Sequence, residues 1–332
     1  MKNLLVISND KLFFSKRGIS SKFNDTLNIL DALQKKFNIF LISRKAYSAE
    51  NFNLKRTKIN KFSFKNFLES REKKIHVFII SVTPLNVFFY LLLNLFYGKV
   101  NGFIYLRSDG YQEYKIKFGI FGYFFFSLMM RLVKKNLKVI SVNKNIKTTK
   151  INYLITPSEL DKKWFQKIKL SQLHFPTLLY LGRFKKEKGV HSLIELFQNI
   201  KFKFKLTIAG GEDDLLKKSK NIKFIKELSN QRKIINLYDS HNIFILPSYT
   251  EGSPKVILES LVRKKPIIIF EDIKHVKSNY KGIFISKRDS VNLKRTIFYI
   301  LKNYSEIQNE MRKNILITKK EFQKKLINIV DE

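Results

Sequence analysis

The stretch that decides the fold is residues 243–261, Ile-Phe-Ile-Leu-Pro-Ser-Tyr-Thr-Glu-Gly-Ser-Pro-Lys-Val-Ile-Leu-Glu-Ser-Leu. Its apolar start predicts a β-strand, followed by a loop that contains Glu251. Ser253 is expected to be the N-cap of a helix and Pro254 its first residue, where a missing N–H costs nothing. Glu259 lies on that helix, with seven residues between it and Glu251. A helix N-terminus flanked by carboxylates predicts a site for a ligand that carries phosphate and hydroxyl groups.

A second interpretation of the same helix needs no ligand. Lys255, Glu259 and Arg263 are spaced four residues apart. They are therefore also compatible with a solvated helix face held by ion pairs of a few tenths of a kcal/mol.

Three further segments accompany this stretch in a consistent order: Leu178–Gly189, Leu206–Glu212 and Asn242–Ser248. Together the four segments resemble the group 1 retaining glycosyltransferases, also called family four, whose signature is two glutamates separated by seven residues. The resemblance is specific over residues 177–290 and has no specific motif over 1–172. It implies the GT-B fold, an α/β fold with two Rossmann-like, doubly wound parallel-sheet domains that face a central cleft.

The alternation of apolar, β-branched runs with longer helical patterns independently predicts parallel sheets covered by helices. The predicted strands are 3–7, 39–42, 77–80, 102–106, 138–142, 153–156, 178–181, 205–209, 221–224, 243–246, 267–270 and 282–285. We therefore expect an acceptor-binding domain over 1–172 and a nucleotide-sugar donor-binding domain over 173–304. The resemblance implies that the helical tail, 305–332, crosses back to the first domain.

The resemblance also implies how the donor half acts on a nucleotide-diphosphate sugar. Arg183 and Lys188 would stabilise the negative charge that grows on the leaving phosphate, as fixed cations can. Glu251 would hold hydroxyls of the transferred sugar near the developing positive charge. A solvated basic loop remains the alternative for the two cations.

The remaining donor contacts concern the nucleotide and its phosphates. Glu259 would accept hydrogen bonds from the ribose hydroxyls, since a carboxylate suits a diol. Lys255 would line the pocket or pair with Glu259. The other expected binding residues are Gly182, Gly210, Gly211, Gly252, Ser253 and Pro254, where glycine permits close approach of the donor. We predict no metal ion and no cofactor beyond the donor itself.

The first half departs from the family pattern. Only Gly18 follows the first strand, where many members have a glycine pair, and the usual histidine is replaced by Arg107 and Asp109. Asp109 is a candidate to orient or deprotonate the acceptor hydroxyl. An ordinary Asp-Gly turn is the alternative.

Composition limits the remaining possibilities. The 332 residues contain no cysteine, which excludes disulfides and thiolate metal sites and suits a cytoplasmic location. The net charge of +37 attracts anions such as nucleotides, anionic lipids or nucleic acid. A genome rich in A and T would also raise the lysine content, so the charge alone identifies no partner.

Two apolar stretches bear on membranes. Residues 75–98 lack charged side chains but contain a polar, proline-bearing break, and the uncharged run 118–130 is too short to cross a bilayer. We therefore predict no transmembrane helix. The second stretch runs into Arg131, Lys134 and Lys135, so it suits either a core helix or peripheral contact with an anionic inner membrane face.

The resulting hypothesis is a retaining, hexosyltransferase-type glycosyltransferase. It would transfer a sugar from a nucleotide-diphosphate sugar to a glycan or lipid-linked glycan in surface polysaccharide synthesis. Two alternatives remain: a relative that binds the donor without transferring it, and a basic module that binds nucleic acid.

Overall fold

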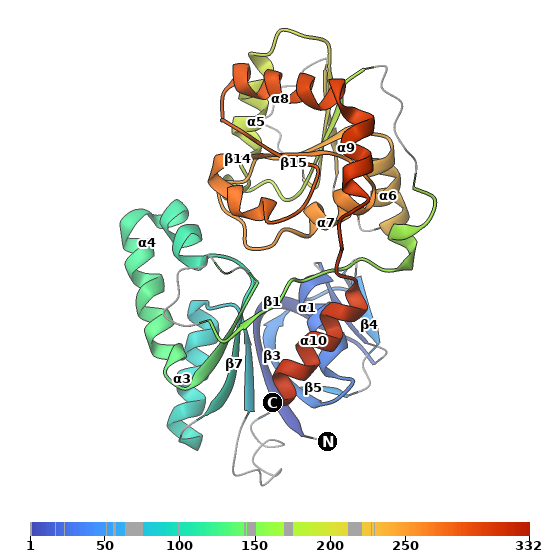
Figure 1. The fold of residues 1–332 in the computed structure, drawn as a ribbon. Helices are drawn as coiled ribbons and strands as arrows, with labels where there is room; N and C mark the ends of the chain where they lie inside the picture. Colours follow the sequence, from blue (N-terminus) through green and yellow to red (C-terminus); the bar gives the residue numbers. More distant parts are fainter. Residues whose placement is uncertain are drawn as a thin grey trace. The chain divides into compact units, whose positions relative to one another are not determined.

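The protein is described by a computed structural model over residues 2–16, 18–22, 24–50, 52–55, 58–63, 76–98, 100–142, 144, 151–168, 175–211, 221–226, 228 and 230–332. The chain divides into unit 1, Met1–Glu159 with Lys319–Glu332, and unit 2, Leu160–Thr318 (Figure 1). The expected boundary at 172/173 lies outside the described residues. The division comes earlier because Leu160 and Trp164 are buried in the core of unit 2.

The described strands of unit 1 form a nine-stranded sheet. The strands are β1 (Asn3–Phe14), β2 (Gly18–Ser21), β3 (Asn38–Lys45), β4 (Phe52–Lys55), β5 (Ile59–Lys61), β6 (His76–Ile80), β7 (Asn101–Leu106), β8 (Leu137–Ser141) and β9 (Tyr153–Leu154). The main order is β4-β2-β1-β6-β7-β8-β9, and β3 pairs with both β1 and β5. The predicted strands of this half are confirmed. The antiparallel pairs of β2 with β1 and β4 were not predicted, because these short strands lack a long apolar run.

The helices of unit 1 cover both faces of its sheet. Those in the described residues are α1 (Asn24–Leu33), α3 (Pro84–Tyr97), α4 (Gly110–Lys134) and α10 (Lys319–Asp331). The path β6-α3-β7-α4-β8 steps in one direction across adjacent parallel strands. Right-handed crossovers then bring α3 and α4 to the same face, and α1 to the opposite one (Figure 1).

Helix α10 closes unit 1 by packing against α1. The Gln323 side chain donates to Asp31 Oδ2 at 2.8 Å and accepts from Lys35 Nζ at 2.6 Å. The region expected as one tail therefore divides, since α9 (Tyr304–Met311) stays in unit 2 and α10 joins unit 1.

Helix α4 is broken near its middle. By length and composition alone, Gly110–Lys134 is the one described helix that could cross a membrane. Gly119, however, has φ +66° and ψ −154°, which no helix contains. The chain folds back there. As a result, the ring centre of Tyr111 lies 5.3 Å from that of Tyr123 and 4.8 Å from that of Phe126. The helix is therefore a hairpin of two shorter helical segments.

The described strands of unit 2 form a six-stranded parallel sheet in the order β12-β11-β10-β13-β14-β15. They are β10 (Thr177–Leu181), β11 (Lys205–Ala209), β12 (Ile222–Ile225), β13 (Ile243–Leu246), β14 (Ile267–Phe270) and β15 (Ile283–Ser286), which confirms the six predicted strands. The helical elements that the structure describes in this unit are η1 (Lys162–Phe165), η2 (Lys186–Lys188), α5 (Val190–Gln198), α6 (Gln231–Asp239), α7 (Lys255–Val262), η3 (Glu271–Lys277), α8 (Ser290–Lys302) and α9.

The strand order of unit 2 reverses between β10 and β13. From β10 the chain steps outward to β11 and β12, then returns to β13 on the other side of β10 and continues to β14 and β15. Every residue of β13 and β14 is buried, as expected for the centre of a sheet covered on both faces. Ligands of open α/β sheets bind beyond the carboxyl ends of the strands at such a reversal point.

Candidate functional site

The loop after β13 leads directly to the reversal point of unit 2. Helix α7 begins at Lys255, and Pro254 is its N-cap with φ −71° and ψ 120°. The expectation that Ser253 is the N-cap and Pro254 the first helical residue is therefore wrong by one position. The extended ψ of Pro254 delays the helix. The Pro254 side chain makes no capping hydrogen bond to α7, so this N-terminus is compatible with an anionic ligand.

Lys188 and Glu251 form an ion pair at this point. Lys188 Nζ lies 2.7 Å from Glu251 Oε1, and the side chains are 18% and 9% exposed. The Ser248 hydroxyl donates to the same oxygen at 2.6 Å. The two loops touch closely, because a Cβ on Gly189 would lie 2.1 Å from the Pro247 carbonyl oxygen. The structure thus brings together two predicted site residues that are 63 positions apart in the chain.

The backbone around Glu251 is held by neighbours that sequence reasoning missed. The Tyr249 N–H donates to the Glu187 carbonyl at 2.9 Å. Nε2 of His275 lies 3.0 Å from the Glu251 carbonyl oxygen, so it donates when protonated at that nitrogen. Together these contacts fix the position of the carboxylate-bearing loop.

Arg288 supports the same loop from the end of β15. Its guanidinium donates to the Pro247 carbonyl at 3.0 Å and to Asp272 Oδ2 at 2.6 Å, and lies 4.2 Å from the centre of the Tyr249 ring. No local pattern distinguishes this arginine from the many other basic residues, so sequence reasoning had no signal for it.

Tyr180 contacts the backbone of Arg183. Its hydroxyl, at the end of β10, donates to the Arg183 carbonyl at 3.0 Å. Burial raises the pKa of Tyr180, the Glu251 carboxylate raises it further, and Arg183 opposes the shift. Arg183 itself is exposed.

Glycines bring the ends of β10 and β11 together. Gly210 has φ +117°, and a Cβ there would lie 2.4 Å from the Gly182 carbonyl oxygen. The Gly182 N–H donates to the Ala209 carbonyl at 2.9 Å. A Cβ on Gly211 would meet the Phe184 ring at 2.9 Å. The three predicted glycines thus lie together at the carboxyl edge of the sheet.

Glu259 has a separate partner on α6. The buried Tyr238 hydroxyl donates to Glu259 Oε2 at 3.0 Å, and burial followed by the Glu259 charge raises the pKa of Tyr238. Glu259 and Lys255 are half-buried on α7, after the buried Gly252 and the half-buried Ser253. The structure therefore holds Glu259 through Tyr238, a contact between helices that the sequence pattern did not indicate.

The same helix is not a solvated ion-pair face. Arg263 is fully buried, and its guanidinium donates to Asp239 at 2.7 and 2.9 Å. It also donates to the carbonyls of Trp164, Gln166 and Lys167 at 2.8 to 2.9 Å. Arg263 thereby connects the start of unit 2 to its core. This excludes the interpretation of Arg263 as part of a solvated helix face.

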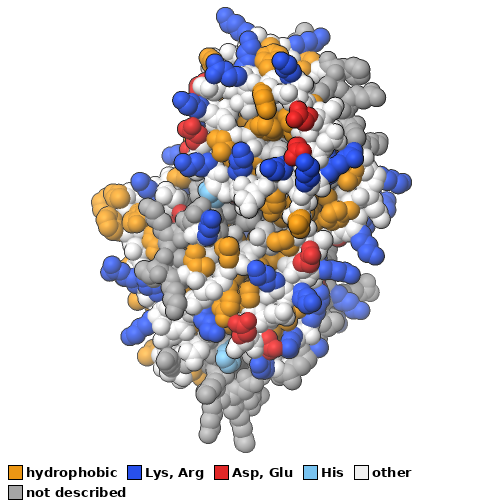
Figure 2. Space-filling model, viewed as in Figure 1, with side chains coloured by type: hydrophobic (Ala, Val, Ile, Leu, Met, Phe, Trp, Pro, Cys, Tyr) orange, Lys and Arg blue, Asp and Glu red, His pale blue; other side chains and the backbone are white. Residues whose placement is uncertain are grey.

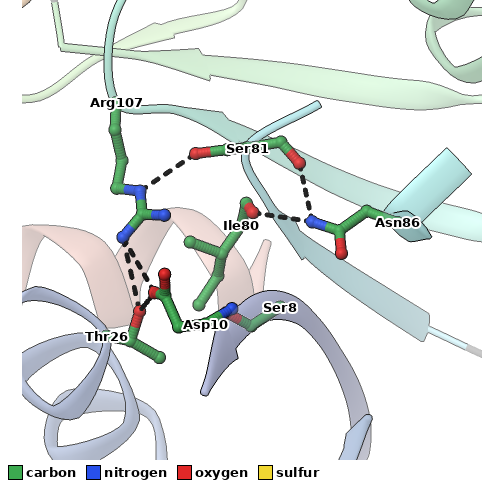
Figure 3. Close-up of polar contacts among 7 residues, drawn as sticks. All are labelled: Ser8, Asp10, Thr26, Ile80, Ser81, Asn86 and Arg107. Carbon is green, nitrogen blue, oxygen red and sulfur yellow. Dashed lines mark hydrogen bonds and ion pairs between the residues drawn. The ribbon is translucent and has the colours of Figure 1, made fainter. Parts of the chain in front are cut away.

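The reversal point of the sheet in unit 1 holds a second polar cluster (Figure 3). Arg107, after β7, donates to Asp10 Oδ2 at 3.1 Å and to the Ser81 hydroxyl at 2.9 Å. Thr26 on α1 also hydrogen-bonds to Asp10. Asp10 and Arg107 are 26% and 27% exposed, so both remain accessible to solvent.

Two features shape this cluster. The register between β1 and β3 shifts between Ile7 and Lys11, the segment that contains Asp10. Ser81 has φ +66°, and its carbonyl and that of Ile80 accept from the Asn86 side chain at 2.9 and 2.8 Å. Such a strained conformation is uncommon outside glycine and is often found at functional sites.

Asp109 has a different part in unit 1. Its Oδ1 accepts from the N–H groups of Tyr111 and Gln112 at 3.0 and 3.3 Å, so it is the N-cap of α4. Sequence reasoning selected Asp109 and missed Asp10, although Asn9 and Asp10 interrupt the first apolar run. Among the described residues, no group of three or more His, Cys, Asp or Glu could hold a metal ion.

Comparison with known proteins adds an independent observation to this geometry. Residues 161–316 match the family model described as glycosyl transferases group 1. This region is nearly all of unit 2 and includes both loops of the Lys188–Glu251 pair. Unit 2 is therefore similar in sequence to the group 1 glycosyltransferases.

Curated relatives match the same part of the chain. An uncharacterized glycosyltransferase of Methanocaldococcus jannaschii is 29% identical over 160 residues, which are 44% of this chain and 43% of the relative. The capsular polysaccharide biosynthesis glycosyltransferase CapM of Staphylococcus aureus is 30% identical over 33% of this chain and 32% of its own. A third relative, from Campylobacter jejuni, is named N,N'-diacetylbacillosaminyl-diphospho-undecaprenol alpha-1,3-N-acetylgalactosaminyltransferase and is 25% identical over 39% and 36%. Each match spans less than half of the relative's length.

Solved structures resemble the whole chain. Sucrose-phosphate synthase from Thermosynechococcus elongatus has a TM-score of 0.72 at 12% identity and covers 99% of this chain and 98% of its own. Anabaena HepE, solved in complex with UDP-glucose, has a TM-score of 0.64 at 12% identity over 100% of both chains. At this identity the similarity establishes the fold, which is GT-B with two α/β domains.

Proposed function

We propose that this protein is a retaining glycosyltransferase that uses a nucleotide-diphosphate sugar and acts in surface polysaccharide synthesis. The observation that carries the proposal is the Lys188–Glu251 pair, at 2.7 Å, where the strand order of a group 1 glycosyltransferase domain reverses. A cation and a carboxylate at this point match the two charges that sugar transfer creates.

The donor chemistry assigns one charge to each side chain. The bond between the anomeric carbon and the diphosphate oxygen breaks, and its electron pair stays on that oxygen. Lys188 and Arg183 stabilise the resulting negative charge, while Glu251 stabilises the positive charge on the sugar ring. Lys188 has three donor hydrogens, so it can keep its contact with Glu251 while it binds phosphate.

In this proposal retention results from attack on the face that the diphosphate leaves. The acceptor oxygen bonds to the anomeric carbon on that face, and its proton passes to the departing phosphate oxygen. Glu259 accepts hydrogen bonds from the ribose in this proposal, since Tyr238 holds its carboxylate in place. The N-terminus of α7 and the glycines at 182, 210 and 211 then line the phosphates.

We assign acceptor recognition to unit 1. Asp10 and Arg107 lie at the reversal point of its sheet and offer an acceptor and a donor to a hydroxyl-rich ligand. They replace Asp109, whose carboxylate caps α4. A lipid-linked glycan is the favoured acceptor class, by analogy with the Campylobacter relative named for diphospho-undecaprenol. A cytoplasmic location is part of the proposal.

A two-stage experiment tests the proposed function. The protein is first screened by thermal shift against UDP, GDP, ADP and CMP sugars, and transfer or hydrolysis is then measured with the donor that stabilises it. Lys188→Ala and Glu259→Ala are each expected to lower turnover by at least 100-fold, while the fold remains intact. Lys186→Ala is the matched control, because Lys186 lies in the same η2 turn and is exposed.

The outcomes separate the alternatives. Full turnover in Lys188→Ala would refute the assigned role of the cation. Donor binding without transfer or hydrolysis would indicate a relative that has lost catalysis. Binding to nucleic acid that falls steeply with salt and ignores Glu259 would indicate a basic binding module.

A further inference from the structure

Helices α3 and α4 expose many large apolar side chains on unit 1. Their exposed large hydrophobic side chains are Phe88, Leu91, Leu95, Phe96, Phe118, Ile120, Phe121, Phe124, Phe125, Leu128 and Leu132. Soluble proteins seldom expose apolar patches of more than a few hundred Å², and larger ones mark interaction sites. We call these eleven residues the α3–α4 surface.

The spacing of these residues shows that each helix exposes a face. On α4, residues 121, 124, 128 and 132 recur at intervals of three or four, and 88, 91 and 95 do so on α3. Both helices cover the same face of the sheet. Figure 2 shows hydrophobic side chains gathered along the edge of unit 1 that α4 forms, with basic side chains beside them.

The charges around this surface have one predominant sign. Over residues 110–135 the basic residues are Lys115, Lys117, Arg131, Lys134 and Lys135. The one acidic residue of that stretch, Glu113, lies 3.8 Å from Lys117. An apolar face with cationic flanks is complementary to an anionic lipid surface, because the rings enter the acyl boundary while the cations meet the headgroups.

The hairpin in α4 sets the mode of contact. Because Gly119 breaks the helix, the longer segment runs from Ile120 to Lys134 and measures about 22 Å at 1.5 Å per residue. This is shorter than the hydrocarbon core of about 30 Å. The close approach of the two segments requires glycine at position 122, since a Cβ there would lie 2.2 Å from the Tyr114 carbonyl oxygen.

We propose that the α3–α4 surface docks unit 1 on the surface of an anionic membrane without crossing it. Phe121, which is 82% exposed, and its neighbours at 124 and 128 insert into the interface. Arg131, Lys134 and Lys135 bind the headgroups. This inference uses no residue of the proposed donor or acceptor site. Its test is therefore independent of the test of sugar transfer.

The absence of cysteine from the sequence permits a direct test. A single cysteine is introduced as Phe121→Cys and labelled with an environment-sensitive fluorophore. Val291→Cys is the matched control, because Val291 is an apolar residue, 66% exposed, on a helix of unit 2. Vesicles contain either phosphatidylcholine alone or phosphatidylcholine with 30% phosphatidylglycerol.

The expected result is a blue shift of the label at position 121 with anionic vesicles, and no shift at position 291. A Phe121→Ser/Phe124→Ser/Leu128→Ser variant is expected to bind these vesicles at least tenfold more weakly in flotation. Arg131→Gln/Lys134→Gln/Lys135→Gln is expected to lose about fivefold for each cation removed. Circular dichroism checks that each variant is folded.

Three outcomes would overturn the proposal. One is equal binding by the wild type and the apolar variant, and another is a label shift of the same size at both positions. The third is a wild-type dimer that does not bind vesicles and dissociates in the triple-serine variant, which would make this surface an interface between two copies of the chain.

Discussion

The ion pair between Lys188 and Glu251 should stabilise the fold as well as serve the proposed chemistry. Its atoms lie 2.7 Å apart, and Glu251 is 9% exposed. Hydrogen bonds to charged groups contribute about 1.5–3 kcal/mol. Lys188→Ala leaves a mostly buried carboxylate with Ser248 as its side-chain partner. We therefore expect this substitution to lower the free energy of unfolding by about 2–3 kcal/mol.

A double-mutant cycle isolates the pair from other effects of the substitution. Because the double variant Lys188→Ala/Glu251→Gln has no unpaired charge, it should lose about 1.5–3 kcal/mol less than the sum of the two single variants. The measurement is urea unfolding followed by circular dichroism. Transfer activity should be lost in all three variants, which separates stability from catalysis.

An exposed ion pair provides the reference for this cycle. Lys313 and Glu310 lie 2.5 Å apart, but their side chains are 68% and 43% exposed. Their coupling energy should be much smaller than that of the Lys188–Glu251 pair, because solvent screens exposed charges. If the Lys188–Glu251 cycle is additive within about 0.5 kcal/mol, the argument from burial is wrong.

Three further predictions concern stability. Gly210→Ala should cost about 1–3 kcal/mol in thermal unfolding, because φ is +117° and the new Cβ meets the Gly182 carbonyl oxygen; an unchanged melting temperature would contradict this. Arg263→Leu should cost about 3–5 kcal/mol by leaving Asp239 unpaired, and Arg263→Leu/Asp239→Leu should recover part of the loss. Burial lowers the pKa of His241 in the native state, whereas in the unfolded chain it has its ordinary value of about 6.5. Below pH 6.5 the unfolded chain therefore binds more protons than the native state. Stability should therefore fall as the pH drops below 6.5, by up to about 1.4 kcal/mol per unit, and His241→Gln should remove this slope.

Much of the fold could be predicted because apolar runs have a simple physical meaning. Strands such as β13 and β14 consist of four consecutive apolar residues that are buried on both faces. Strands β2, β4 and β5 were missed because they are short and contain polar residues. Their formation depends on pairing with neighbouring strands rather than on an apolar pattern in their own sequence. The hairpin at Gly119 was missed for a related reason, since aromatic residues on both sides of it have a helical pattern.

The site was partly predictable for a topological reason. Parallel strands end at one edge, so residues that follow β10 and β13 had to approach each other, and Lys188 and Glu251 do so. Contacts made by lone side chains from distant elements had no local signal, which explains why Asp10, Tyr238 and Arg288 were not found. Asp109 was selected because its position fits two roles, and the structure gives it the helix cap.

The interrupted order of unit 1 along the chain has a consequence for biosynthesis. Its last helix, α10, buries Phe322, Leu326 and Ile329, and it follows the whole of unit 2 in the sequence. During translation, residues 160–318 emerge from the ribosome while unit 1 still lacks this covering helix. Unit 1 is therefore completed only after unit 2 has been synthesised, and until then the face that α10 covers is available to a chaperone.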